Sequence, residues 1–244
     1  MGAFFSLVYG VVVYVLFMAT FLYAIGFVGN VFVPKSIDTG ASGSLAQALV
    51  ADLSLLAVFA IQHSAMARRS FKAHWTRIVS PVVERSTYVL AATLALALLL
   101  WQWRPIAEPV IWRLHDPLTA KLLWVVFWLG WGVLLTSSFL IDHFELFGVK
   151  QVVANLNGSE LPQPEFRTPL FYRFVRHPIY LGFLLGFWAT PVMTAGHLLF
   201  AVGCTGYILI GIWFEERDLV AQFGDRYLRY RRQVGMLVPG RRAP

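Results

Sequence analysis

Two long stretches of this sequence contain no Lys, Arg, Asp or Glu, and they limit what the chain can fold into. One precedes Lys35, and the other runs from Ile179 to Phe214. A helix needs ~20 mostly apolar residues to cross the hydrocarbon core of a membrane. Only 14% of all residues are charged, whereas soluble domains average about 25%. The sequence therefore predicts an all-α integral membrane protein rather than a water-soluble fold.

The apolar stretches predict five or six transmembrane helices, with six the better count. Four candidate spans are Phe4–Val28, Leu45–Gln62, Ser86–Trp103 and Leu122–Ile141. The first is too long for the apolar part of a signal peptide and lacks a basic start, so we expect it to be retained. The 36 residues of Ile179–Phe214 suit two spans, each of ~18 residues and ~27 Å. Because Thr190-Pro191 disfavours continued helix, we expect a helical hairpin that reverses between Pro191 and His197.

The distribution of basic residues predicts the orientation in the membrane. Lys and Arg gather in cytoplasmic loops. Met66–Arg85 carries five basic residues against one acid, and the tail after Phe214 has seven arginines. We therefore expect both termini, Met66–Arg85 and Asp142–Pro178 to be cytoplasmic, in a bacterial-type inner membrane. The same bias explains the net charge of +7, and no motif indicates nucleic-acid binding.

We expect one membrane domain with four parts. These are an N-terminal four-helix part (1–141), a cytoplasmic connection (142–178), the helical hairpin (179–214) and a cytoplasmic tail (215–244) that covers a cofactor. The tail is basic and has Leu219, Phe223, Tyr227 and Tyr230 at helical spacing. This pattern predicts a C-terminal helix that lies either on anionic lipid or over a cytoplasmic pocket.

Four polar clusters adjoin the apolar spans, and the expected orientation puts all of them at cytoplasmic helix ends. Ionisable groups next to lipid are costly, so they indicate functional sites. The clusters are Gln62-His63-Ser64, Asp142-His143-Phe144-Glu145, Arg176-His177-Pro178-Ile179-Tyr180 and Glu215-Glu216-Arg217-Asp218. The structural alternatives are interfacial anchors for Arg176 and Arg217, a satisfied interfacial histidine for His63, and a helix cap for Asp142-His143.

The third cluster has a local physical interpretation. Pro178 suits the first turn of a helix, where its missing N–H costs nothing. His177 then precedes free N–H groups and the positive end of the helix dipole, which favour an anionic group of a cofactor. Gly182 and Gly186 follow on one face of that helix, and this spacing lets another helix or a ligand approach the backbone closely.

The last third of the chain resembles the isoprenylcysteine carboxyl methyltransferase superfamily. The resemblance rests on the order and spacing of Arg176-His177-Pro178-Ile179-Tyr180-Leu181-Gly182, Glu215-Glu216, and Phe223-Gly224 through Tyr227 and Tyr230 to Val238-Pro239. In that family this region binds S-adenosylmethionine at the cytoplasmic face. The resemblance implies a cofactor site formed by Arg176, His177, Pro178, Tyr180, Gly182, Glu215, Glu216, Tyr227 and Arg231.

The whole chain is similar to the narrower NnrU-like branch, through Gln62-His63-Ser64-Ala65-Met66-Ala67 and Asp142-His143-Phe144-Glu145-Leu146-Phe147-Gly148. Within that branch it is most similar to enzymes that methylate methanethiol to dimethyl sulfide, which implies a small thiol as methyl acceptor. A prenylcysteine carboxylate, a phospholipid amine, and a non-catalytic accessory role are the alternatives.

Methyl transfer to a thiol needs the thiolate, and a small thiol is mostly protonated at neutral pH. His63 and His143 are the candidate bases, because histidine accepts protons near neutral pH. Asp142 is a candidate to orient one of them, and Arg173 or Arg176 to favour an anion. The spacing of His, Asp and Glu shows no dedicated metal motif, and methyl transfer requires no metal.

Overall fold

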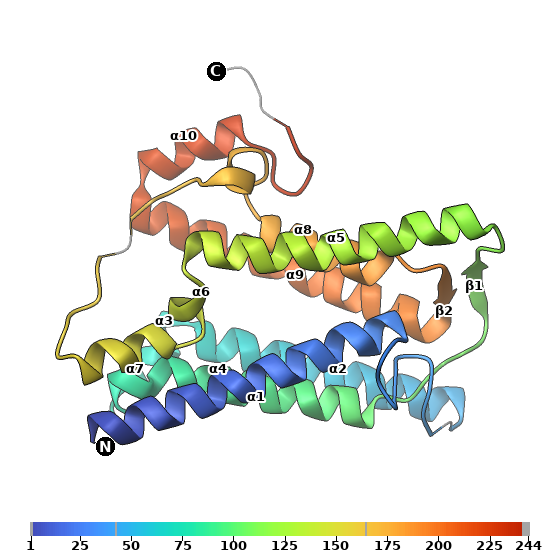
Figure 1. The fold of residues 1–244 in the computed structure, drawn as a ribbon, viewed down its shortest axis with the longest axis horizontal. Coiled ribbons are helices and arrows are strands. Elements are labelled where there is room, and N and C mark those ends of the chain that lie inside the picture. Colours follow the sequence, from blue (N-terminus) through green and yellow to red (C-terminus); the bar gives the residue numbers. More distant parts are fainter. Residues whose placement is uncertain (1, 42, 164, 241–244) are drawn as a thin grey trace. The chain divides into compact units, whose positions relative to one another are not determined.

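A computed structural model describes residues 2–41, 43–163 and 165–240 (Figure 1). Within these residues, five helices are long and apolar enough to cross a membrane, namely α1 (Ala3–Gly29), α2 (Leu45–Ala67), α4 (Pro81–Gln102), α5 (Pro117–Ile141) and α9 (Ala195–Phe223). The first four contain or closely overlap the four N-terminal spans expected from hydropathy. The protein is therefore an all-α integral membrane protein with several passes.

The remaining elements are short. They are α3 (Arg69–Trp75), β1 (Val110–Arg113), α6 (His143–Leu146), α7 (Val149–Leu156), the 3₁₀ helix η1 (Leu170–Arg173), α8 (Pro178–Trp188), β2 (Val192–Thr194) and α10 (Asp225–Gln233). β1 and β2 form a two-stranded sheet. The indole N–H of Trp112 on β1 donates to the carbonyl of Thr190 at 2.9 Å, so this sheet meets the turn that follows α8.

The helices belong to two compact units. The first comprises the described residues within Met1–Val110, His143–Pro162 and Thr194–His197, and the second those within Ile111–Asp142, Gln163–Met193 and Leu198–Pro244. In the first unit α1, α2 and α4 pack together, and α7 lies against α1 and α4. Val13, Tyr88 and Val89 form its buried apolar cluster, and Phe17 and Phe147 pack against that cluster.

In the second unit α8 packs closely against α5. A Cβ atom at Gly182 would lie 2.6 Å from the carbonyl oxygen of Gly130 and 2.8 Å from Cβ of Leu134. One at Gly186 would lie 2.8 Å from the indole of Trp131. The glycine pair therefore serves close helix packing, which is the role of small residues in membrane helices.

The C-terminal hairpin is unequal. α8 has 11 residues and α9 has 29, whereas the sequence suggested two similar spans. At 1.5 Å per residue α8 is only ~16 Å long, less than the ~30 Å hydrocarbon core. α8 ends before Thr190-Pro191 as expected. α9 continues through Glu215 and Glu216 and ends before Gly224, whose φ of +53° favours glycine.

Candidate active site

Five of the expected cofactor residues come together in the second unit. Arg176 and His177 immediately precede α8, Glu215 and Glu216 lie near the end of α9, and Arg231 lies on α10. Short nitrogen–oxygen distances connect all five. We call these five residues the carboxylate cluster.

Glu216 is the centre of the carboxylate cluster. Its Oε1 accepts from Nε of Arg176 at 2.8 Å and lies 3.2 Å from Nε2 of His177. Its Oε2 lies 3.2 Å from Nε of Arg231. Only 9% of the Glu216 side chain is exposed. A buried carboxylate needs cationic or hydrogen-bonding partners, and here both oxygens have them, which explains how α9 carries the charge next to Trp213-Phe214.

Glu215 differs from its neighbour in exposure. Its side chain is 45% exposed, and its Oε2 lies 3.6 Å from Nδ1 of His177. One carboxylate of the pair is therefore committed to internal contacts, and the other is open to a ligand. The sequence indicated both residues without distinguishing them.

His177 is held between the two carboxylates and is almost fully buried. Burial by itself lowers the pKa of His177. The hydrogen bonds and charges of Glu215 and Glu216 outweigh burial and raise the pKa above its ordinary value. The imidazolium form of His177 is therefore favoured more than that of an ordinary histidine.

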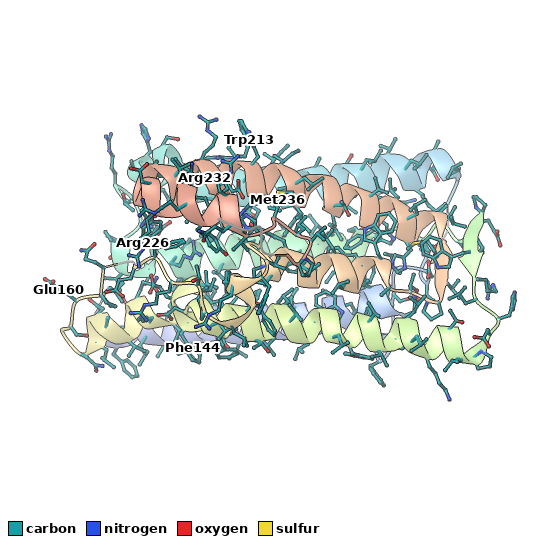
Figure 2. The ribbon with its side chains drawn as sticks, turned by 90° about the horizontal axis from the view of Figure 1, so that it is seen from above. Phe144, Glu160, Trp213, Arg226, Arg232 and Met236 are labelled. Carbon is teal, nitrogen blue, oxygen red and sulfur yellow. The ribbon has the colours of Figure 1, made fainter. Side chains whose placement is uncertain are left out.

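Arg176 connects the start of α8 to the C-terminal segment. Its Nη1 donates to the carbonyls of Arg231 and Val234 at 3.0 and 2.6 Å. The backbone N–H groups of Arg176 and His177 donate to the carbonyls of Gly235 and Met236. Met236 lies on the segment that follows α10 (Figure 2). Arg176 thus connects the start of α8 to α9 and to the C-terminal segment, which differs from the role of a membrane anchor.

Aromatic side chains surround the carboxylate cluster. The ring of Tyr180 lies 5.7 Å from that of His177. Tyr227 is 2% exposed, and its buried hydroxyl has no hydrogen-bond partner among the described residues. The ring centroid of Phe166 lies 5.9 Å from that of Tyr227 and 5.3 Å from that of Tyr230. Sequence reasoning missed Phe166, because it lies in a polar, Pro-rich loop where one aromatic residue gives no periodic signal.

The other expected residues of this unit have simpler surroundings. Pro178 occupies the first turn of α8, as expected. Gly182 faces α5, as described above, so its visible role is helix packing. Arg173 is exposed at the end of η1. The backbone N–H of Asp142 caps α5 by donating to Ser138, with a φ of +130°.

The two candidate bases belong to the first unit, and each pairs with a tyrosine. Nε2 of His63 lies 2.9 Å from the hydroxyl oxygen of Tyr88. Nε2 of His143 lies 2.9 Å from that of Tyr14. No sequence pattern indicated either tyrosine, because an aromatic residue inside an apolar helix looks like any packing residue. That the histidines converge with the carboxylate cluster remains a prediction.

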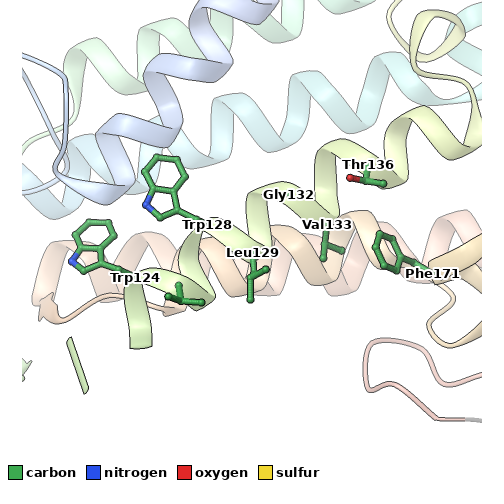
Figure 3. A pocket seen from close by; sticks show the side chains of 8 residues that line it. Trp124, Trp128, Leu129, Gly132, Val133, Thr136 and Phe171 are labelled. Atoms are coloured by element: carbon green, nitrogen blue, oxygen red, sulfur yellow. The ribbon is translucent and has the colours of Figure 1, made fainter. Parts of the chain in front are cut away.

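An apolar groove runs along α5 (Figure 3). Its lining residues are Trp124, Val125, Trp128, Leu129, Gly132, Val133, Thr136 and Phe171. They carry no charge, and Val125 and Leu129 are more than half exposed. The groove fits a lipid-facing helix surface and shares no residue with the carboxylate cluster.

Comparison with known proteins identifies the family. The chain is 55% identical over 240 residues to Methanethiol S-methyltransferase 1 of Bradyrhizobium diazoefficiens, covering 98% of this chain and 84% of that protein. It is 54% identical over 239 residues to Methanethiol S-methyltransferase of Mycobacterium tuberculosis, covering 98% of each chain. Nurim of Xenopus laevis is 31% identical over 199 residues, covering 78% of this chain and 70% of that protein.

No protein-family model matches the chain, and no solved structure matches it. The family is therefore defined by the relatives alone, and the two bacterial ones share more than half of the aligned residues. The chain belongs to the methanethiol S-methyltransferase family.

Proposed function

We propose that this protein methylates methanethiol to dimethyl sulfide, with S-adenosylmethionine as methyl donor, at the cytoplasmic face of the membrane. The observation that carries the proposal is the 54% identity to the Mycobacterium tuberculosis methanethiol S-methyltransferase over 98% of both chains. At this identity and coverage the same reaction is the simplest expectation.

The carboxylate cluster fits the charged end of S-adenosylmethionine, which carries an ammonium and a carboxylate. The half-exposed carboxylate of Glu215 suits the ammonium, and the half-exposed guanidinium of Arg231 suits the carboxylate. The buried hydroxyl of Tyr227 offers a hydrogen bond that no described residue takes. When bound, this cofactor supplies an electrophilic methyl group on a sulfonium.

The remaining cofactor residues have supporting roles in this proposal. Glu216, Arg176 and His177 hold α9, α10 and the start of α8 in one arrangement. Pro178 begins α8 directly behind them, and Tyr180 places its ring against His177. Gly182 keeps α8 close to α5. Such preorganisation lowers the entropic cost of ligand binding.

The thiol that accepts the methyl group must lose its proton, so the site needs a proton acceptor and a group that stabilises the thiolate. His63 and His143 are the proposed proton acceptors, Asp142 a group that orients His143, and Arg173 a cation that favours the anion. Burial lowers the pKa of His143, so its imidazole is neutral at neutral pH and able to accept a proton. General-base assistance of this kind is worth about 10²–10⁴-fold in rate.

The proposed location is the inner membrane, with both termini cytoplasmic. Its support is the concentration of basic residues in Met66–Arg85 and in the tail after Phe214. S-adenosylmethionine is made in the cytoplasm, so a site built from the residues after Phe214 must face that side.

The deciding experiment is a headspace measurement of dimethyl sulfide. The purified protein receives S-adenosylmethionine and methanethiol, and a parallel sample receives a prenylcysteine or a phospholipid amine in place of the thiol. We expect dimethyl sulfide only with methanethiol. Methylation of the prenylcysteine or the lipid instead would refute the acceptor, and failure to bind S-adenosylmethionine by calorimetry would refute the enzyme class.

A further inference from the structure

The two candidate bases differ in which partner of the histidine–tyrosine pair is buried. His143 is only 3% exposed, whereas its partner Tyr14 is half-buried. In the other pair Tyr88 is 8% exposed, and His63 is the half-buried member. The tyrosine is therefore the more accessible member of the first pair, and the histidine that of the second.

The Tyr14–His143 pair has the geometry of a proton relay. The hydroxyl oxygen of Tyr14 lies 2.9 Å from Nε2 of His143, and the rings meet edge to face with centroids 5.7 Å apart. A tyrosine hydroxyl both donates and accepts. It can therefore donate its proton to the imidazole while its oxygen accepts a proton from a third group.

Aromatic rings line the same place. The ring of Tyr14 lies 6.0 Å from Phe144 and 6.2 Å from Phe147, and Phe147 stacks on Phe17 at 4.2 Å. His143 contacts both Phe144 and Phe147. Sulfur makes favourable contacts with aromatic rings. A thiol that reaches the hydroxyl of Tyr14 would therefore lie close to aromatic rings.

The His63–Tyr88 pair is less suited to accept a proton. The guanidinium of Arg85 lies 5.2 Å from the centre of the Tyr88 ring, and the hydroxyl of that ring contacts His63. A proton on His63 would add a second positive charge near Arg85. His63 is also stacked on Phe59, with centroids 5.4 Å apart. The pair also joins α4 to α2, so His63 is the weaker of the two proposed proton acceptors.

We propose that Tyr14 is a catalytic residue, whose hydroxyl takes the proton of the bound thiol and passes its own proton to Nε2 of His143. This inference rests on the proposed methylation of methanethiol. In the balanced step the S–H bond breaks, the Tyr14 O–H proton moves to His143, and the thiol proton replaces it. The electron pair of the S–H bond stays on the thiol sulfur, which forms the new S–CH₃ bond. At the same time the bond between the sulfonium and its methyl group breaks, and its electrons stay on the sulfur of the donor.

The test compares Tyr14→Phe with two matched variants that each delete one tyrosine hydroxyl of the same unit. Tyr88→Phe removes the hydroxyl that contacts His63, and Tyr9→Phe removes one that contacts Thr87 at 3.1 Å. Turnover is measured with methanethiol and with methaneselenol, a close steric match whose more acidic selenol is largely ionised without a base. Calorimetry with S-adenosylmethionine checks folding.

We expect Tyr14→Phe to lower turnover of methanethiol by on the order of 100-fold, and to leave methaneselenol turnover and cofactor affinity nearly unchanged. Tyr88→Phe and Tyr9→Phe should retain most activity with both acceptors. His143→Gln should behave like Tyr14→Phe, and the double variant should lose no more than either single one, because both interrupt one proton path.

Two results would overturn the relay. Equal losses with methanethiol and methaneselenol would mean that Tyr14 only supports the structure, and full activity of Tyr14→Phe would mean that no proton passes through it. Failure of the proposed function is a separate result, because the unaltered protein would then produce no dimethyl sulfide. Should Tyr14→Phe not bind S-adenosylmethionine, His143→Gln replaces it in the test. Equal losses of turnover with methanethiol and methaneselenol in His143→Gln would then overturn the relay.

Discussion

Nε of Arg176 donates to Oε1 of Glu216 at 2.8 Å, with 11% and 9% of the two side chains exposed. The pair joins residues 40 positions apart, one before α8 and one on α9. Since the other groups of Arg176 hold carbonyls of the C-terminal segment, this ion pair ties three parts of the second unit together. Removing Glu216 takes away the carboxylate that pairs with the buried Arg176, whereas Glu216 without Arg176 still contacts His177 and Arg231.

The first prediction separates the two adjacent glutamates. Glu215→Gln should weaken S-adenosylmethionine binding by about 10-fold or more, the typical effect of losing a charge-assisted hydrogen bond, with little change in thermal stability. Glu216→Gln should lower the unfolding temperature as well, because it leaves Arg176 and Arg231 without a carboxylate. Calorimetry and thermal unfolding in detergent measure the two effects. Unchanged affinity in both variants would refute the cofactor site.

The second prediction concerns the pH dependence of stability. The pKa of His177 is raised in the folded protein, so protonation stabilises the fold. That contribution is complete below the ordinary histidine value of ~6.5 and is lost as pH rises through the raised pKa. The unfolding temperature should therefore decrease as the pH is raised from mildly acidic to alkaline. His177→Gln should reduce this slope, and His115→Gln, at an exposed position, should not.

The third prediction concerns the packing of α8 on α5. Gly182→Ala adds a Cβ atom 2.6 Å from the carbonyl oxygen of Gly130, and overpacking of this kind typically costs about 1–3 kcal/mol. Gly132→Ala is the matched control, because no atom lies within 4 Å of a Cβ at that position. Thermal unfolding should distinguish them. Equal stability of the two variants would contradict the close approach of α8 and α5.

The fourth prediction is the orientation in the membrane. A reporter fused to the C-terminus should score as cytoplasmic, because the tail after Phe214 has seven arginines. A reporter inserted between Thr190 and His197 should score on the opposite side, since that segment carries no Lys, Arg, Asp or Glu. A periplasmic C-terminus would reverse the orientation and remove the cofactor site from the cytoplasm.

Hydropathy predicted the long helices well because the membrane sets a minimum apolar length. α1 and α5 match their expected spans within a few residues. The unequal lengths of α8 and α9 were not predictable, because the end of α9 depends on tertiary contacts. Glu215 and Glu216 suggested that the helix ended there. Arg176, His177 and Arg231 instead pair with these carboxylates, and α9 continues beyond them.

The sequence indicated the kinds of residue in the candidate site better than their roles. Two carboxylates next to Trp213-Phe214 need cations or hydrogen-bond donors, and in the structure Glu216 contacts Arg176, His177 and Arg231. Which carboxylate is buried depends on the rotation of α9, and no pattern in a single sequence specifies it. The roles of Tyr14 and Tyr88 could not be predicted for another reason. Each depends on a contact between the tyrosine hydroxyl and a histidine of another helix, and the sequence alone does not show such contacts.

The last prediction separates the two candidate bases by turnover and pH. His143→Ala should lower dimethyl sulfide formation by about 10²–10⁴-fold at neutral pH, with S-adenosylmethionine affinity unchanged, because the base acts on the acceptor. Raising the pH should partly restore the rate, since solvent then supplies thiolate. His63→Ala should be affected less, because Arg85 lies close to its partner Tyr88. If both variants keep near-native rates, neither histidine is the base, and the pocket must act through positioning and desolvation.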